Sequence, residues 1–204
     1  MTYTRTILTA ITLALATILI AAYAARQPRL PKRYEDQRSL TIYQVMVASF
    51  NRDTTATVPG YTAMWGPDGN RKDGNIAGIT AALDHIAAIG ANAIWLTPIF
   101  DSSKAKGGEK LQATGYFAND YFAIDPHFGT FADLHRLVDE AHARGLYVIL
   151  DGVFGHHGGV TTPSPSGYTI DSTPCTNVRD TIPSGNVAYP ASLPYFREVA
   201  TWWV

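Results

Sequence analysis

Residues 146–154 read LYVILDGVF, and these nine residues give the clearest indication of the architecture. Its nearly continuous apolar character predicts a strand that is covered on both faces in a parallel sheet. Asp151 interrupts the run among mostly apolar neighbours, and a buried carboxylate without a hydrogen-bonding or cationic partner is costly. His156 follows five residues later and could face the same cleft. Spacing alone leaves a functional pair and a structural pair equally open.

Two similar runs precede this one. Residues 40–50 (LTIYQVMVASF) and residues 93–100 are rich in β-branched and aromatic side chains and have the length of strands. A helix is predicted between each pair of runs, and a further helix is predicted over residues 193–204. This order predicts an α/β fold of βα units around parallel strands.

Both internal helices show apolar residues at helical spacing. The first has its stripe at Ile79, Leu83, Ile86 and Ile89, and Gly90 is expected to end it. In the second helix, Thr130 is the expected N-cap and Asp133 lies in the first turn. Its apolar stripe consists of Leu134, Leu137, Val138 and Ala141. Arg144 and Gly145 are expected to end the helix.

The N-terminal segment has the composition of a secretory signal. Residues 1–24 carry one cation at Arg5, a long apolar stretch and a small-x-small site at residues 22–24. The alternative is a retained membrane anchor, because residues 7–25 nearly suffice to cross a bilayer. The signal predicts a secreted or periplasmic protein without a membrane contact after cleavage, and residues 25–39 are expected to form an exposed leader.

Composition excludes several classes of protein. Hydrophobic residues make up 46% of the chain, which indicates a packed core. The 16 Lys and Arg balance 17 Asp and Glu, so a nucleic-acid partner is not expected. Cys175 is the only cysteine, which excludes an intrachain disulfide and a cysteine-based zinc site.

Ligands bind at the carboxyl ends of strands in a parallel βα architecture, and polar residues follow each of the three runs. Asp53 lies near the end of the first run. Asp101 follows the second, where we interpret it as an ordinary transition from strand to loop. Asp151 and the pair His156-His157 belong to the third.

Four segments of this chain resemble the alpha-amylase family of glycoside hydrolases. Residues 151–156 (DGVFGH) resemble its first signature, which has an Asp at the end of the third barrel strand and a His shortly after. Residues 115–130 (GYFANDYFAIDPHFGT) are similar to its stretch between the second strand and the second helix. Residues 42–45 (IYQV) and 90–98 (GANAIWLTP) are similar to its first two strands. The segments occur in the family's order.

The resemblance implies three βα units of a (β/α)8 barrel over residues 40–156. It also implies that residues 157–190, which are rich in Gly, Pro, Ser and Thr, begin a small inserted domain after the third strand. A loop of this length is uncommon in a compact domain unless it is functional. Residues 191–204 would then start the third barrel helix.

The resemblance also assigns roles in sugar binding. Tyr116 is implied to stack on the sugar ring next to the scissile bond, and His156 to hydrogen-bond the same sugar. Asp151 is implied to be a buried acid that orients a downstream Arg. Phe117 stands where the family commonly has an aromatic residue next to the stacking ring. A role in core packing alone is an equally open alternative for Phe117. The catalytic carboxylates are expected after Val204, so we assign no catalytic residue within these 204 residues.

Calcium is the only cofactor that the resemblance suggests. The family often has an Asn ligand just before the signature His, but here that residue is Gly155, which has no side-chain oxygen. A second calcium site is suggested near Asp53 and Asn75, where a solvated polar loop is the more common alternative. A zinc site of Asp151, His156 and His157 is a weaker alternative, since adjacent histidines usually point apart.

The expected activity is hydrolysis or transglycosylation of alpha-glucosidic bonds in an alpha-glucan or oligosaccharide, with retention of configuration. Residues 1–204 by themselves are expected to be inactive. Two rivals remain: a membrane-anchored accessory protein with an amylase-like ectodomain, and a carbohydrate-binding module. Neither the exact sugar nor the oligomeric state follows from the sequence.

Overall fold

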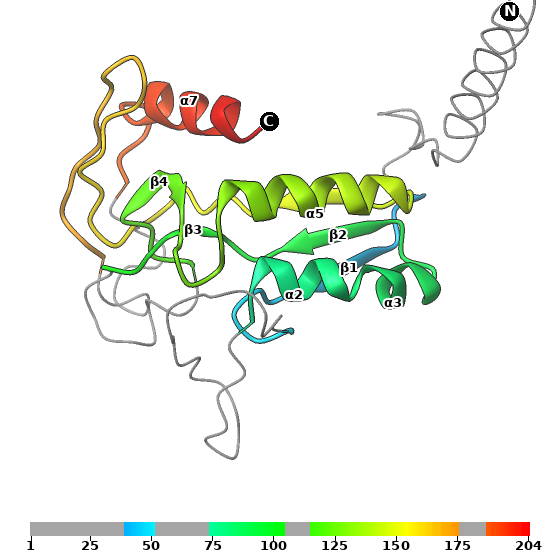
Figure 1. The fold of residues 1–204 in the computed structure, drawn as a ribbon. Coiled ribbons are helices and arrows are strands. Elements are labelled where there is room, and N and C mark those ends of the chain that lie inside the picture. The colour runs from blue at the N-terminus through cyan, green and yellow to red at the C-terminus, as the bar shows by residue number, and fades with distance from the viewer. Residues whose placement is uncertain (1–38, 52–73, 105–114, 176–186) are drawn as a thin grey trace, which may run out of the picture.

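The structure is a computed structural model that describes residues 39–51, 74–104, 115–175 and 187–204 (Figure 1). Three strands, β1 (Ile42–Val45), β2 (Ala93–Leu96) and β5 (Tyr147–Leu150), form a sheet in the order β1-β2-β5. Both pairings are parallel and in register, with Gln44 opposite Trp95 and Trp95 opposite Ile149. The predicted α/β fold with parallel strands is confirmed.

The strands are shorter than the apolar runs that predict them. After β1 the chain turns, and the Ser49 N–H donates to the Met46 carbonyl at 3.0 Å. After β2 the run crosses Pro98, which has no N–H to donate to a ladder. The chain then forms β3 (Phe100–Asp101), which pairs antiparallel with β4 (Asp120–Ile124). This two-stranded ribbon was not predicted from the sequence.

The first predicted helix is divided into α2 (Ile76–Ala81) and α3 (Leu83–Ala88). The break lies at Ala82, whose N–H donates to the Ile79 carbonyl three residues back, which tightens the turn. Gly90 follows with φ of 86°, a left-handed conformation that glycine adopts without a Cβ clash, as expected for the end of this helix.

The second predicted helix is α5 (Phe131–Ala143), and its predicted N-cap is confirmed. Thr130 Oγ1 accepts a hydrogen bond from the Asp133 N–H at 3.2 Å, and the Asp133 carboxylate accepts one from the Thr130 N–H at 2.8 Å. This reciprocal pair is a capping box, which satisfies two amide donors that an uncapped helix leaves unpaired. The last helix, α7 (Leu193–Trp203), also begins where expected.

One apolar core joins the sheet to α2, α3 and α5, which run along it (Figure 1). Alternate strand residues face this core, whereas Ile42 and Trp95 on the other face remain 46% and 36% exposed. The core consists of Val45, Val47, Ala48, Ile76, Ile79, Leu83, Ile86, Ile94, Leu96, Ile99, Ile124, Phe128, Leu134, Leu137, Ala141 and Leu146.

A second, aromatic cluster holds the β3–β4 ribbon, the segment after β5 and α7 together. Tyr121 is its centre: the ring packs edge-on against Phe100 at 5.0 Å and Phe196 at 5.2 Å between centroids. The Trp203 indole N–H donates to the Tyr121 carbonyl at 2.7 Å. The cluster therefore fixes the segment after β5 in place by packing, because the described part of that segment contains no helix or strand before α7.

Candidate functional site

The four residues predicted to bind sugar lie close together beyond the carboxyl end of β5. Asp151 directly follows this strand, and its N–H donates to the Leu96 carbonyl at the end of β2. Tyr116 and Phe117 come from the segment that leads into β4, and His156 comes from the segment after β5. Two separate parts of the sequence thus meet at the sheet end where ligands of parallel βα proteins bind.

Asp151 is the partly buried carboxylate of this site. The Tyr116 hydroxyl donates to its Oδ2 at 3.5 Å, and the side chain of Trp95 on β2 is a second hydrogen-bond donor. Burial raises the pKa of Asp151 above its ordinary value, and the bonds from Tyr116 and Trp95 act in the opposite direction. Burial also raises the pKa of Tyr116, and the negative charge of Asp151 adds to this effect.

His156 lies against Phe117, with the two ring centroids 4.8 Å apart. Burial lowers the pKa of His156, which favours the neutral ring, and a hydrogen bond with the backbone of Tyr116 opposes that shift. Its Nε2 atom is buried and has no hydrogen-bond partner among the residues that the structure describes. Most buried polar atoms in folded proteins have a hydrogen-bond partner, so this atom distinguishes His156 from ordinary core residues.

Phe117 is 3% exposed and packs against Cys175 as well as His156. Its buried ring therefore packs against the His156 ring. Tyr116 is more exposed than Phe117, so part of its surface remains accessible.

Tyr121 positions the backbone of the site. Its hydroxyl lies 2.8 Å from the Val153 carbonyl and 3.1 Å from the His156 carbonyl, so one buried donor serves both acceptors. Burial raises the pKa of Tyr121 strongly and keeps it a neutral donor. The sequence analysis did not single out Tyr121 or Trp95. Their residue types are those of ordinary core positions, and their roles depend on partners 32 and more residues away.

Asp125 is a second buried carboxylate, 1% exposed, that the sequence analysis did not identify. Its Oδ2 accepts hydrogen bonds from the N–H and the hydroxyl of Ser102 at 3.1 and 3.2 Å. Its Oδ1 accepts from the His127 N–H at 2.9 Å and lies 2.7 Å from His127 Nδ1. All of these partners are protein groups, so Asp125 joins the loop after β3 to the loop before α5.

The residues predicted to bind calcium do not form a site within the described part of the chain. Asn75 is 2% exposed, and its side chain accepts the Gly78 N–H at 2.6 Å as the N-cap of α2. Asp53 lies outside the described residues. No group of three or more His, Cys, Asp or Glu that could hold a metal occurs among the residues described. The calcium site stays a prediction, and no chemical step below uses a metal.

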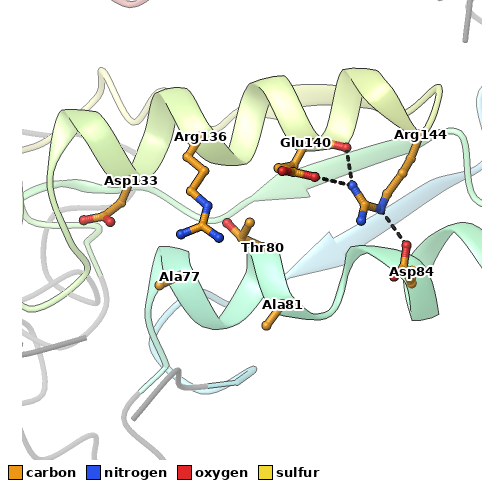
Figure 2. A pocket seen from close by; sticks show the side chains of 8 residues that line it. All are labelled: Ala77, Thr80, Ala81, Asp84, Asp133, Arg136, Glu140 and Arg144. Atoms are coloured by element: carbon orange, nitrogen blue, oxygen red, sulfur yellow. Dashed lines mark hydrogen bonds and ion pairs between the residues drawn. The ribbon is translucent and has the colours of Figure 1, made fainter. Parts of the chain in front are cut away.

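Two polar hollows lie elsewhere. One, of about 260 Å³, runs between α2, α3 and α5 and holds the ion pairs of Arg144 with Asp84 and Glu140, both at 2.6 Å (Figure 2). The other, of about 320 Å³, lies between the start of β4 and the segment after His157. Neither is lined by the predicted sugar-binding residues. The first connects two helices through complementary charges, which is a structural role.

Comparison with known proteins identifies related sequences and structures. The chain is 37% identical over 125 residues to a cyclomaltodextrinase of Bacillus sp, covering 59% of this chain and 21% of the relative. It is 32% identical over 190 residues to an intracellular maltogenic amylase of Bacillus subtilis strain 168, covering 82% and 31% respectively. The chain therefore spans between about a fifth and a third of these relatives.

Among solved structures, this chain is similar to AmyP. The match to an AmyP variant in complex with maltotriose has a TM-score of 0.64 at 43% identity and covers 80% of this chain and 31% of that one. AmyP in complex with maltose matches with a TM-score of 0.62, also at 43% identity. The family model for the alpha-amylase catalytic domain matches residues 41–166. Because this match covers more than half of the chain, the chain belongs to the alpha-amylase family.

Proposed function

We propose that the whole protein is a glycosidase or transglycosylase that acts on alpha-glucosidic bonds of a glucan or oligosaccharide by the retaining mechanism. The observation that carries this proposal is the convergence of Tyr116, Asp151 and His156 at the carboxyl end of β5. The maltose and maltotriose in the related AmyP structures support the class of substrate.

Within this site, the described residues bind and orient a sugar. The flat Tyr116 ring suits the apolar face of a pyranose, and its hydroxyl is held beside Asp151. The unpartnered Nε2 of His156 can exchange a hydrogen bond with a sugar hydroxyl. The neutral ring that burial favours can donate or accept at this atom, depending on its tautomer.

Bond cleavage needs two further carboxyl groups, one to attack the anomeric carbon and one to protonate the leaving oxygen. We place both after Val204. Asp151 is surrounded by donors, Tyr116 and Trp95, which suits an ionised carboxylate that accepts hydrogen bonds and holds a cation. We therefore assign Asp151 a positioning role.

An assay of the purified whole protein against maltotriose and cellotriose tests the proposal. We expect cleavage of the alpha-linked sugar alone, with the alpha anomer as the first product in a proton NMR time course. Cleavage of cellotriose alone, first release of the beta anomer, or maltotriose binding without turnover would contradict it. The last result would favour a carbohydrate-binding module.

We also propose that residues 1–24 are a cleaved secretory signal, from the composition of that segment. Among the described residues, no helix combines the length and the apolar character that crossing a bilayer requires. Export should give a species that begins at Ala25, which N-terminal sequencing can detect. An exported species that retains Met1 would favour the membrane-anchored accessory protein.

A further inference from the structure

His157 is a fully buried histidine next to His156, and its surroundings are different. The His156 ring lies against Phe117, whereas the His157 ring lies among the backbone groups of the segment that follows it. That segment, residues 158–175, contains no strand or helix. Its conformation therefore depends on specific side-chain bonds and on packing, not on a backbone ladder.

The His157 side chain and backbone connect both ends of this segment. Nδ1 accepts hydrogen bonds from the Gly159 N–H at 3.1 Å and the Val160 N–H at 3.3 Å. The His157 carbonyl accepts the Cys175 N–H at 2.9 Å. Gly159 has φ of 105°, a conformation that a residue with a Cβ rarely adopts, and this local turn places its N–H beside the ring. The ring also has a hydrogen bond with the backbone of Asp171.

The far end of the segment packs against the candidate sugar site. Cys175 is 3% exposed and forms a small apolar cluster with Phe117, with Tyr116 at its edge. Phe117 in turn contacts the His156 ring. A continuous series of contacts thus runs from His157 through Cys175 and Phe117 to His156.

We propose that His157 is a positioning residue that anchors residues 158–175 and thereby holds Cys175 and Phe117 against the sugar-binding ring of His156. In this proposal, residues 158–175 hold the side chains around His156 in the conformation that binds the sugar. The anchoring bonds follow from the geometry alone, while their effect on catalysis rests on the function proposed above.

Protonation of His157 would oppose this anchor. Nδ1 can accept two N–H groups only when it carries no proton, so a charged ring would place a donor against two donors. Burial lowers the pKa of His157 below its ordinary value of 6.5, the Asp171 backbone bond and charge oppose the shift, and His156 adds to it. With a lowered folded pKa, the stabilisation is complete above 6.5 and is lost as the pH falls through the folded value.

Reactivity of the Cys175 thiol measures the anchor without any sugar. The experiment uses the whole protein with any further cysteines replaced by serine, and labels it with 4,4′-dithiodipyridine. Rates are divided by those of N-acetylcysteine at the same pH, which removes the intrinsic pH dependence of the thiol. His157→Asn keeps an acceptor near the Nδ1 position, His157→Phe removes it, and His135→Asn on the exposed face of α5 is the matched control.

At pH 7.5 we expect His157→Phe to raise the normalised rate by about tenfold, because two backbone donors lose their acceptor and the segment opens more often. His157→Asn should restore most of the protection, and the control should equal the parent protein. As the pH falls to 5, the rate should rise in the parent and stay flat in His157→Asn. With maltotriose, His157→Phe should raise KM more than it lowers kcat.

Equal labelling of the parent and His157→Phe would overturn the proposal. If His157→Phe does not fold, the parent and His157→Asn decide the matter. The same pH dependence of the normalised Cys175 labelling rate in these two proteins would also overturn the proposal. The expected labelling in a protein that lacks activity on maltotriose would support the anchor and contradict the proposed function. Equal labelling rates in the parent and the His157 variants of a protein that cleaves maltotriose would contradict the anchor and leave the proposed function standing.

Discussion

The Tyr116 hydroxyl lies 3.5 Å from Oδ2 of Asp151, across a separation of 35 residues in the sequence. This contact joins the segment before β4 to the end of β5 and defines the candidate site. It is longer than an ideal hydrogen bond between oxygens and is therefore a weak one. Its electrostatic effect nonetheless acts on the acid, because it lowers the pKa that burial raises.

Tyr116→Phe keeps the ring and removes this donor, so the pKa of Asp151 should rise further. If the ionised form of Asp151 supports catalysis, activity is lost as the pH falls through that pKa. The acid limb of kcat/KM should therefore move to higher pH in the variant. A pH profile on maltotriose checks this, with Tyr168→Phe, a tyrosine that is 48% exposed, as the control. An acid limb that is unmoved or shifted to lower pH would contradict the assignment.

Asp125→Ala should destabilise the protein by about 3 kcal/mol, since it removes a carboxylate that is 1% exposed and accepts hydrogen bonds from Ser102 and His127. Asp139→Ala, at an exposed position on α5, should change stability by less than about 0.5 kcal/mol. Denaturant unfolding of both variants measures the difference. Equal midpoints and slopes would show that Asp125 has no structural role.

The sequence predicted those strands and helices that neighbouring residues determine, through an apolar run or a helix cap. The apolar runs predicted β1, β2 and β5, and Thr130 with Asp133 predicted the start of α5. The ribbon of β3 and β4 was missed because its pairing joins residues about 20 apart, and β3 has only two residues. The break of the first helix at Ala82 has no local signal, because alanine favours an unbroken helix.

The candidate site was predicted in part, for a related reason. Tyr116 and His156 were found because they stand in segments that resemble a family, and the structure brings them together. The role of Trp95 could not be predicted, because it depends on the neighbouring strand that places Asp151 beside it. His157 stands beside His156 in the sequence, and its full burial and its two N–H partners, which distinguish it from His156, depend on the fold.

A polypeptide of residues 1–204 alone should have no glycosidase activity. It contributes three parallel strands to the described sheet, and we propose that both catalytic carboxyl groups lie outside these residues. The exposed face of the sheet around Ile42 and Trp95 should also make this piece poorly soluble. The check is an assay on purified, mass-verified polypeptide that is free of host amylase. Maltotriose cleavage at an enzyme-like rate would contradict the prediction.

The proposed sugar pocket is tested by comparing kcat/KM for maltotriose in the whole protein with that of Tyr116→Ala and His156→Ala. Each change removes a side chain that we propose binds the sugar, so each should lower kcat/KM by at least about tenfold, or about 1.4 kcal/mol of transition-state stabilisation. Tyr168→Ala and His135→Ala, at exposed positions, should leave it unchanged. Unchanged kinetics in both site variants, in a protein that cleaves maltotriose, would show that this group of residues is not the sugar pocket.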